Sequence, residues 1–244
     1  MSGVLQKGAL VSFSPTFVPF PVPNVIIFQY NPETMTHTWT QPGPKPPSAT
    51  ATGPAEGSNP LAVKGLPGES FSFTIAMDAN EEIAEGSPPT AALAQGSGIY
   101  SRLAALEMLL YPVIGGQSGL LGAVSAAISS ARSGQASSAT SKVPQSVMPV
   151  TLFIWGSGRI VPVRVTGLTI TEKLYDSALN PTHAEAQLAL QVLTPAELRS
   201  ASADNDVLAQ VATNAYLNTL AQRQKLALEN LSNTAESIIG MIPR

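Results

Sequence analysis

The amino-acid sequence predicts a mainly β protein with helical additions. Apolar and polar residues alternate over residues 69–78 and 184–192, which is typical of half-buried strands. Runs rich in proline, glycine, serine and threonine separate such segments, and a helical spacing of apolar residues takes over after residue 194. With 244 residues, the chain is long enough for one large β domain or for one domain with an appendage.

The first strands are expected near the amino terminus. An apolar run over residues 4–13 predicts one strand, and the prolines at positions 15–23 predict an extended connector. A strand at 24–30 and its partner at 34–40 follow, with Asn31-Pro32 between them as a turn. Residues 41–68 have little periodicity and are expected to form an irregular insert.

The middle of the chain combines the clearest strand with a helix. In residues 69–78 the apolar side chains fall on one face, and the opposite face carries Ser and Thr. Residues 99–111 have a broad apolar helical face that Pro112 ends. The low-complexity segment 115–146 is expected to be a second irregular insert, with a weak helix over 119–131.

The last third predicts a hairpin, another strand and a long helix. Residues 148–156 and 160–171 form the hairpin, in which an isolated Gly167 indicates a bulge. After the strand at 184–192, Thr194, Pro195 and Glu197 match a helix-capping box, and a longer helix runs from about 206 to 239. We therefore expect a β domain over 1–195 and a helical arm over 196–244.

Composition excludes several classes of protein. Charged residues make up only 12% of the chain, and the net charge of −3 comes without a basic cluster, so no nucleic-acid partner is expected. Cysteine is absent, which excludes disulfides, thiolate metal sites and a cysteine nucleophile. No apolar stretch approaches the roughly 18 residues of a membrane span, and the amino terminus lacks the apolar core of a signal peptide.

No catalytic or cofactor site is expected. The two histidines, His37 and His183, are far apart in the sequence and lie in predicted strands. The acidic cluster that begins at Asp78 and continues over 81–85 lacks the ligand spacing of a calcium loop and is expected to be a solvated loop. The glycines at 115–119 lack the Gly-Lys-Ser/Thr ending of a phosphate loop. The sequence thus predicts no enzyme, no cofactor and no metal.

Three separated blocks resemble one family, the tube and tube–baseplate adaptor proteins of contractile injection systems. The first block is an FQYNPE run with a tryptophan downstream, the second is an apolar strand that closes in an aspartate, and the third is a strand–Trp-Gly–strand–Asp turn–strand unit. The residues that carry it, as fold-defining or interface residues, are Phe28, Gln29, Tyr30, Asn31, Pro32, Trp39, Asp78, Trp155, Gly156 and Asp176.

The resemblance implies a tail-tube-like β-barrel or sandwich with one packed helix and a C-terminal helical extension. It further implies a hexameric ring around a channel, with the inner tube, the spike or hub and baseplate proteins as partners. The chain would be made and assembled in the cytoplasm, and any release would occur as part of a whole particle.

Two inserts and an extra helix favour a one-ring junction between spike and tube over a repeating inner-tube subunit, which remains the alternative. A carbohydrate-binding β-sandwich is an alternative from another class. The C-terminal helix is expected to be a docking arm that uses apolar residues at helical spacing, namely Val207, Val211, Leu217, Leu220, Leu228 and Leu231.

Overall fold

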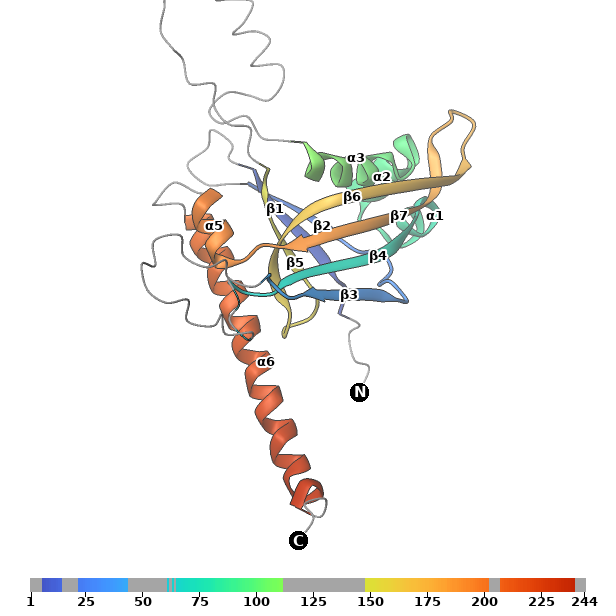
Figure 1. Cartoon of the computed structure of the whole chain (residues 1–244). Coiled ribbons are helices and arrows are strands. Elements are labelled where there is room, and N and C mark those ends of the chain that lie inside the picture. Colours follow the sequence, from blue (N-terminus) through green and yellow to red (C-terminus); the bar gives the residue numbers. More distant parts are fainter. Residues whose placement is uncertain are drawn as a thin grey trace, which may run out of the picture.

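The chain forms one antiparallel sheet of seven strands with helices at both ends of the sheet (Figure 1). The computed structural model describes residues 6–14, 22–43, 61, 63, 65–111, 148–201 and 207–239. The strand order is β2-β1-β5-β6-β7-β4-β3, and every pairing is antiparallel. The strands are β1 (Ala9–Ser14), β2 (Val22–Ile27), β3 (Met35–Thr40), β4 (Gly68–Asp78), β5 (Val150–Ile154), β6 (Ile160–Tyr175) and β7 (Pro181–Val192).

The described helices account for about as many residues as the strands. Three short helices and a 3₁₀ turn follow β4 directly, and two helices follow β7. They are α1 (Ala79–Glu85), α2 (Pro88–Ser97), α3 (Tyr100–Glu107), η1 (Met108–Leu110), α5 (Pro195–Ala201) and the 33-residue α6 (Val207–Ile239). The sequence-based expectation of a mainly β protein with helices agrees with this architecture at that coarse level.

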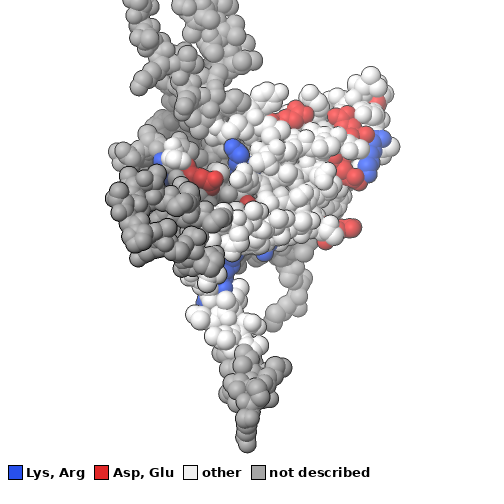
Figure 2. Space-filling view, viewed as in Figure 1, with Lys and Arg blue, Asp and Glu red and all other residues white. Residues whose placement is uncertain are grey.

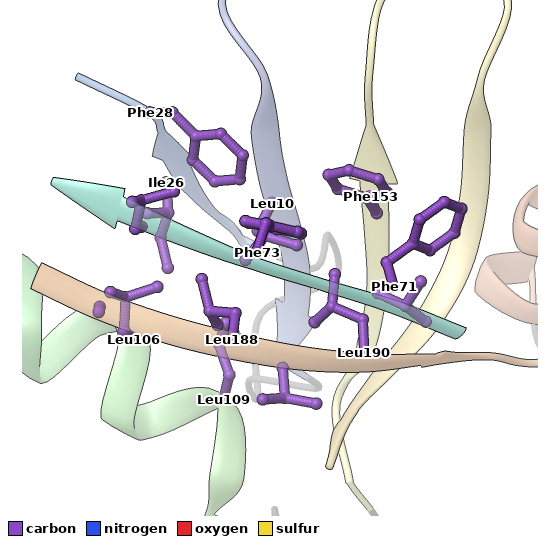
Figure 3. Packing of buried hydrophobic residues seen from close by; sticks show 14 of the residues in the cluster. Leu10, Ile26, Phe28, Phe71, Phe73, Leu106, Leu109, Phe153, Leu188 and Leu190 are labelled. Carbon is purple, nitrogen blue, oxygen red and sulfur yellow. The ribbon is translucent and has the colours of Figure 1, made fainter. Parts of the chain in front are cut away.

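The sheet curls so that strands from its two margins face each other across the core. Phe28 follows β2, at one margin, and Phe73 belongs to β4, next to the other margin, yet their ring centroids lie 5.5 Å apart. Figure 3 shows side chains from β1, β2, β4, β5 and β7 pointing into this common interior. The aromatic rings of Phe71 and Phe153 meet there in a tilted pair at 5.2 Å.

Helices cover the two sides of the curled sheet unequally. On the concave side, Leu103 and Leu106 of α3 are fully buried against the main core. On the convex side, Leu198 of α5 and Ala212 of α6 bury Leu152 of β5 in a second, smaller cluster. α6 packs on β5 and at Ile160, where β6 begins, and in Figure 1 no described helix lies across the convex face of β3, β4 and β7.

Several expectations are confirmed in detail. Phe71, Phe73, Ile75 and Met77 are all buried along β4. The β5–β6 hairpin forms, and the pairing of β6 with β7 shifts register between Val165 and Gly167 of β6, as expected for a bulge. The capping box is present too: the Thr194 backbone amide donates to the Glu197 carboxylate at 2.8 Å, and the Glu197 amide donates to the Thr194 hydroxyl at 3.4 Å.

The expected pairing of the strands around Asn31-Pro32 is wrong. β2 pairs with β1 and β3 pairs with β4, so these neighbours in sequence lie at opposite margins of the sheet. The physical reason lies in residues 28–34: instead of making a tight turn, they carry Phe28 into the core and run across one end of the sheet.

Helices α1 and α2 were not expected from the sequence. Asp78 ends β4 and caps α1 with its side chain, so the acidic run is a first helical turn and not a solvated loop. α2 begins with two prolines at Pro88 and Pro89, where proline is compatible with a helix start. The insert predicted at 115–146, with its weak helix, and about two thirds of the insert predicted at 41–68 lie outside the described residues.

The predicted boundary after residue 195 does not separate two buried clusters. Leu198 and Ala212 lie beyond it and pack on β5, and Tyr216 of α6 belongs to the main core. The proximal part of α6 therefore packs on the sheet through Ala212 and Tyr216.

Candidate interaction surface

The first and third sequence blocks meet at Gly8. Phe28 is almost fully buried, and Trp155 packs against the same core from the end of β5. A Cβ atom added at Gly8 would lie 2.8 Å from ring atoms of both Phe28 and Trp155, which is too close for any side chain. The Phe28 amide also donates to the Gly8 carbonyl at 2.9 Å. Glycine is required here for close approach of the two aromatic rings.

Gln29 fastens the segment after β2 to the end of β4. Its side-chain oxygen accepts from the Asp78 amide, and its side-chain nitrogen donates to the Asp78 carbonyl, both at 2.9 Å. The same nitrogen donates to Glu81, and the Arg102 guanidinium donates to the Gln29 oxygen at 3.3 Å. The amide group thus occupies the place that a neighbouring strand residue would take, and it joins the segment after the marginal strand β2 to β4.

Asp78 connects β4, β7 and α1. Its carboxylate accepts from the Asn80 amide at 2.8 Å and contacts the His183 ring nitrogen at 3.2 Å. Although partial burial acts to raise the pKa of Asp78, the hydrogen bonds from His183 and from the amides of Asn80 and Glu81 hold it below its ordinary value. Asp78 and His183 are therefore structural partners at the end of the sheet.

The Asn31 side chain hydrogen-bonds to the backbone of residues near the amino terminus. Its side-chain oxygen accepts from the Gly8 amide, and its side-chain nitrogen donates to the Gln6 carbonyl, both at 2.9 Å. Tyr30 is exposed beside it, and Pro32 is half-buried. Of the five residues 28–32, three therefore hold the curled sheet through buried or hydrogen-bonded side chains.

A buried carboxylate joins β3 and β4 to α6. The Glu69 side chain is only 2% exposed, and both of its oxygens accept from the Arg223 guanidinium, at 2.6 and 2.9 Å. The His37 ring nitrogen lies 2.7 Å from the same carboxylate. Arg223 also sits over the Trp39 ring at 4.8 Å. We call Glu69, His37, Trp39 and Arg223 the Glu69 cluster.

The pKa of the histidine in the Glu69 cluster is shifted. Burial lowers the pKa of His37 below its ordinary value of 6.5, although the Glu69 carboxylate acts in the opposite direction. The His37 ring stacks on Phe71 at a centroid distance of 4.3 Å, which keeps it out of water on that side. Sequence reasoning selected Trp39 in this cluster but missed Glu69 and Arg223, which are 154 positions apart.

The proximal half of α6 is docked, and its distal half extends beyond the sheet (Figure 1). The Thr219 hydroxyl donates to the Ile160 carbonyl at 2.8 Å and accepts from the Ile160 amide at 3.1 Å. Leu220 packs against the core. The remaining residues of the expected docking arm are exposed: Val207, Val211, Leu217, Leu228 and Leu231.

The convex face of four strands is polar and nearly uncharged. Because directly opposed residues of paired strands point to the same side, the register sets Thr38 beside Ser70 and Thr36 beside Ser72. The rows continue through β7 and β6 with Thr74, Gln187, Ala189, Gln191, Arg164, Thr166, Thr169 and Thr171, and toward the end of β4 they reach the ionisable residues Glu185, Asp78 and His183. Figure 2 shows this side of the molecule mostly free of charged side chains, which lie mainly toward its margins.

Tight turns lie at both ends of β6, the longest described strand. Gly156 adopts a positive φ of 70° in the β5–β6 turn, where the Trp155 amide donates to the Arg159 carbonyl at 2.8 Å. In the β6–β7 turn, the Asp176 carboxylate accepts from the Asn180 side chain and from the backbone amides of Asn180 and Ala178. Those bonds hold the pKa of Asp176 below its ordinary value.

The expected site residues lie at three separate places. Phe28, Gln29 and Asn31 meet Asp78 and Trp155 at one end of the curled sheet, whereas Trp39 lies beside α6 and Asp176 lies at the far tip of a hairpin. Within the described ranges, no group of three or more His, Asp or Glu side chains has a metal-binding arrangement. In the same part of the chain, no helix is long and apolar enough to cross a membrane.

No protein-family model matches this sequence, and a search of curated proteins found no significant match.

Proposed function

We propose that this chain is a structural ring component of a contractile injection system, at the junction between the spike hub and the inner tube. The family resemblance of the sequence motivates the proposal. The observation that carries it in the structure is the broad, neutral, hydroxyl- and amide-rich convex face of β3, β4, β7 and β6. The extended helix α6 adds support.

A neutral polar sheet face suits the wall of a channel. Such a wall needs groups that hydrogen-bond water, because its surface stays wet, and few charges, because fixed charges would bind a passing macromolecule of opposite sign. Rows of Thr, Ser and Gln meet both needs. Lys173 and Glu185 form an ion pair, whereas Arg164 donates to the uncharged Gln191 amide and keeps its charge.

Edge strands offer a way to continue the wall between subunits. β3 ends the sheet, and among the described residues its outer edge pairs with no other strand. Thr36, Thr38 and Thr40 are exposed along it. An unpaired edge is a template for a strand from a neighbour, and a closed ring of subunits leaves no edge bare.

The distal half of α6 is the proposed docking arm toward the hub. Leu228 and Leu231 are 67% and 57% exposed, and no described element packs on them. Exposed leucines on a protruding helix match the helix-in-groove mode of recognition, in which apolar residues at helical spacing enter a groove on the partner. A repeating tube subunit would not need such an arm, which favours the junction.

Trp39 bears on the alternative of sugar binding. Carbohydrate sites use an open aromatic face, but the Arg223 guanidinium lies over the Trp39 ring at 4.8 Å. Trp155, the other tryptophan, packs against the core. Trp155 is therefore not open to a sugar, and Trp39, although 47% exposed, has a cation over one face of its ring.

Affinity capture tests the proposal. The tagged chain would be co-expressed with the inner-tube and spike proteins of its own host, and captured proteins would be identified by mass spectrometry. The full chain is expected to capture both partners, and a chain ending at Lys225 is expected to keep the tube protein and lose the spike. Capture of neither partner by the full chain would contradict the proposal.

A further inference from the structure

The β6–β7 hairpin ends in an apolar tip held in one conformation. Leu174, Tyr175 and Leu179 are exposed there, and Leu179 is the most exposed of the three at 80%. The turn is closed by the Asp176 amide, which donates to the Asn180 carbonyl at 2.9 Å, and by the Leu179 amide, which donates to the Asp176 carbonyl at 3.1 Å. Together with the bonds to the Asp176 carboxylate, they leave the turn little freedom.

Leu179 is an unusual residue for its backbone position. Its φ is +65°, the left-handed region that glycine and asparagine adopt at least cost. A leucine there is unfavourable for the backbone and also exposes apolar surface to water. Stability of the isolated chain therefore does not explain Leu179, whereas a contact that buries its side chain does.

An uncharged, partly apolar groove lies between α6 and the β5–β6 turn. Its volume is about 650 Å³. Leu152, Ile160, Val211, Ala215 and Ala221 supply its apolar surface, and uncharged hydroxyl and amide side chains, among them that of Asn218, line the rest. None of the lining residues is charged, so an uncharged apolar segment can enter without leaving a charge unpaired.

The tip and the groove lie at opposite ends of one strand. Ile160, the first residue of the 16-residue β6, lines the groove, and Tyr175, its last residue, belongs to the tip. At roughly 3.3 Å per residue, the two ends are up to about 50 Å apart. Figure 1 shows the hairpin and α6 on opposite sides of the molecule. The tip of a chain cannot reach its own groove.

We propose that the hairpin tip of one copy inserts into the α6 groove of a second copy. Because the two surfaces differ, the contact is head-to-tail, and a repeated head-to-tail contact closes into a ring when its rotation permits. The proposed function is needed only to assign this contact to the ring of an injection particle. The contact between copies is itself a property of the purified chain.

Disulfide trapping tests the contact directly, since the chain contains no cysteine of its own. A Leu179→Cys protein would be mixed with an Asn218→Cys protein under mild oxidation. A mixed disulfide dimer is expected to form much faster than with a Gln187→Cys protein, whose cysteine lies on the exposed face of β7. Equal rates for the two mixtures would overturn the proposal.

A substitution at the tip separates assembly from folding. Leu179→Gly relieves the left-handed backbone and removes the inserted side chain, so thermal stability is expected to hold or rise while self-association weakens about 10- to 100-fold. Leu231→Asn, on the distal half of α6, is the matched control and is expected to leave self-association unchanged. Sedimentation velocity over a concentration series measures both.

Salt provides a further readout, because no charged residue lines the groove. Self-association is expected to persist at about 0.5 M salt, where charge interactions are largely screened. A wild-type chain that stays monomeric at high concentration, or a Leu179→Gly chain that associates like wild type, would overturn the contact. If the disulfide dimer forms but the full chain captures neither the tube protein nor the spike protein, the contact between copies stands and only the proposed role in an injection particle is refuted.

Discussion

At the scale of single residues, the segment 28–32 holds the curled sheet through contacts between distant parts of the chain. Phe28 fills the core beside Phe73, Gln29 binds the backbone of Asp78, and Asn31 binds the backbone near Gly8. A side-chain amide carries both a donor and an acceptor, so it can hydrogen-bond to a backbone carbonyl and a backbone N–H at the same time.

Replacing Gln29 by alanine is expected to lower the free energy of unfolding by about 1–3 kcal/mol, because the partly buried Asp78 amide and carbonyl lose their partner. Urea unfolding with an unchanged m-value measures the loss. Gln187→Ala on the exposed face of β7 is the control and is expected to change stability by less than about 0.5 kcal/mol. A Gln29→Ala protein as stable as this control would show that Gln29 does not fasten the sheet.

The Glu69 cluster predicts a strong asymmetry between single and double substitutions. Arg223→Met leaves a carboxylate that is 98% buried without its main partner, which costs about 3–5 kcal/mol at neutral pH. Glu69→Met combined with Arg223→Met removes both charges and is expected to recover much of that loss. Chemical denaturation of the wild type, the Arg223→Met variant and the double variant measures the three free energies of unfolding. A double variant no more stable than the single one would contradict the assignment of a paired buried charge.

His37 predicts a pH dependence of stability. Its folded-state pKa lies below 6.5, so the unfolded chain binds a proton there more readily than the folded chain does. This group's contribution is fully present above about pH 6.5 and is lost as the pH falls through the lower folded-state pKa. Unfolding free energies at pH 7 and pH 5 are therefore expected to differ less for His37→Gln than for wild type. An equal difference in both proteins would mean that His37 does not titrate in this way.

At the scale of elements, local pattern predicted strands well and pairing poorly. Alternation marked β4 and β7, and glycine marked the bulge of β6, because those signals lie within a few residues. Pairing of β2 with β3 was expected from their closeness in sequence, but burial of Phe28 carries the chain across the sheet. Helix α1 was not predicted, because acidic residues after a strand are typical of loops as well as of capped helix starts.

Helix α6 predicts two outcomes of truncation. A chain ending at Lys225 keeps Tyr216, Thr219 and Arg223, so its melting temperature is expected to stay within a few degrees of that of the full chain. A chain ending at Ala201 loses those contacts, exposes the second cluster around Leu152, and is expected not to fold cooperatively. Differential scanning calorimetry compares the two. If the shorter chain folds cooperatively with the stability of the full chain, α6 does not contribute to the stability of the sheet.

At the scale of the whole molecule, the structure combines a curled sheet, a neutral convex face and a protruding helix. The sequence predicted the presence of the strands and of the long helix, since these depend on periodicity. It did not predict the contacts of Glu69 with Arg223 or of Gln29 with Asp78, because hydrogen bonds between residues 154 and 49 positions apart leave no local pattern. The surfaces proposed for assembly, at the hairpin tip and the α6 groove, likewise exist only after folding.

The number of copies per particle tests the central claim most directly. Injection particles would be purified from the native host, and this chain would be quantified by mass spectrometry against the sheath and spike proteins of the same particles. A junction component is expected at one ring's worth of subunits per particle. Many rings' worth would identify the chain as the repeating inner-tube subunit, and its absence from every particle would contradict the account.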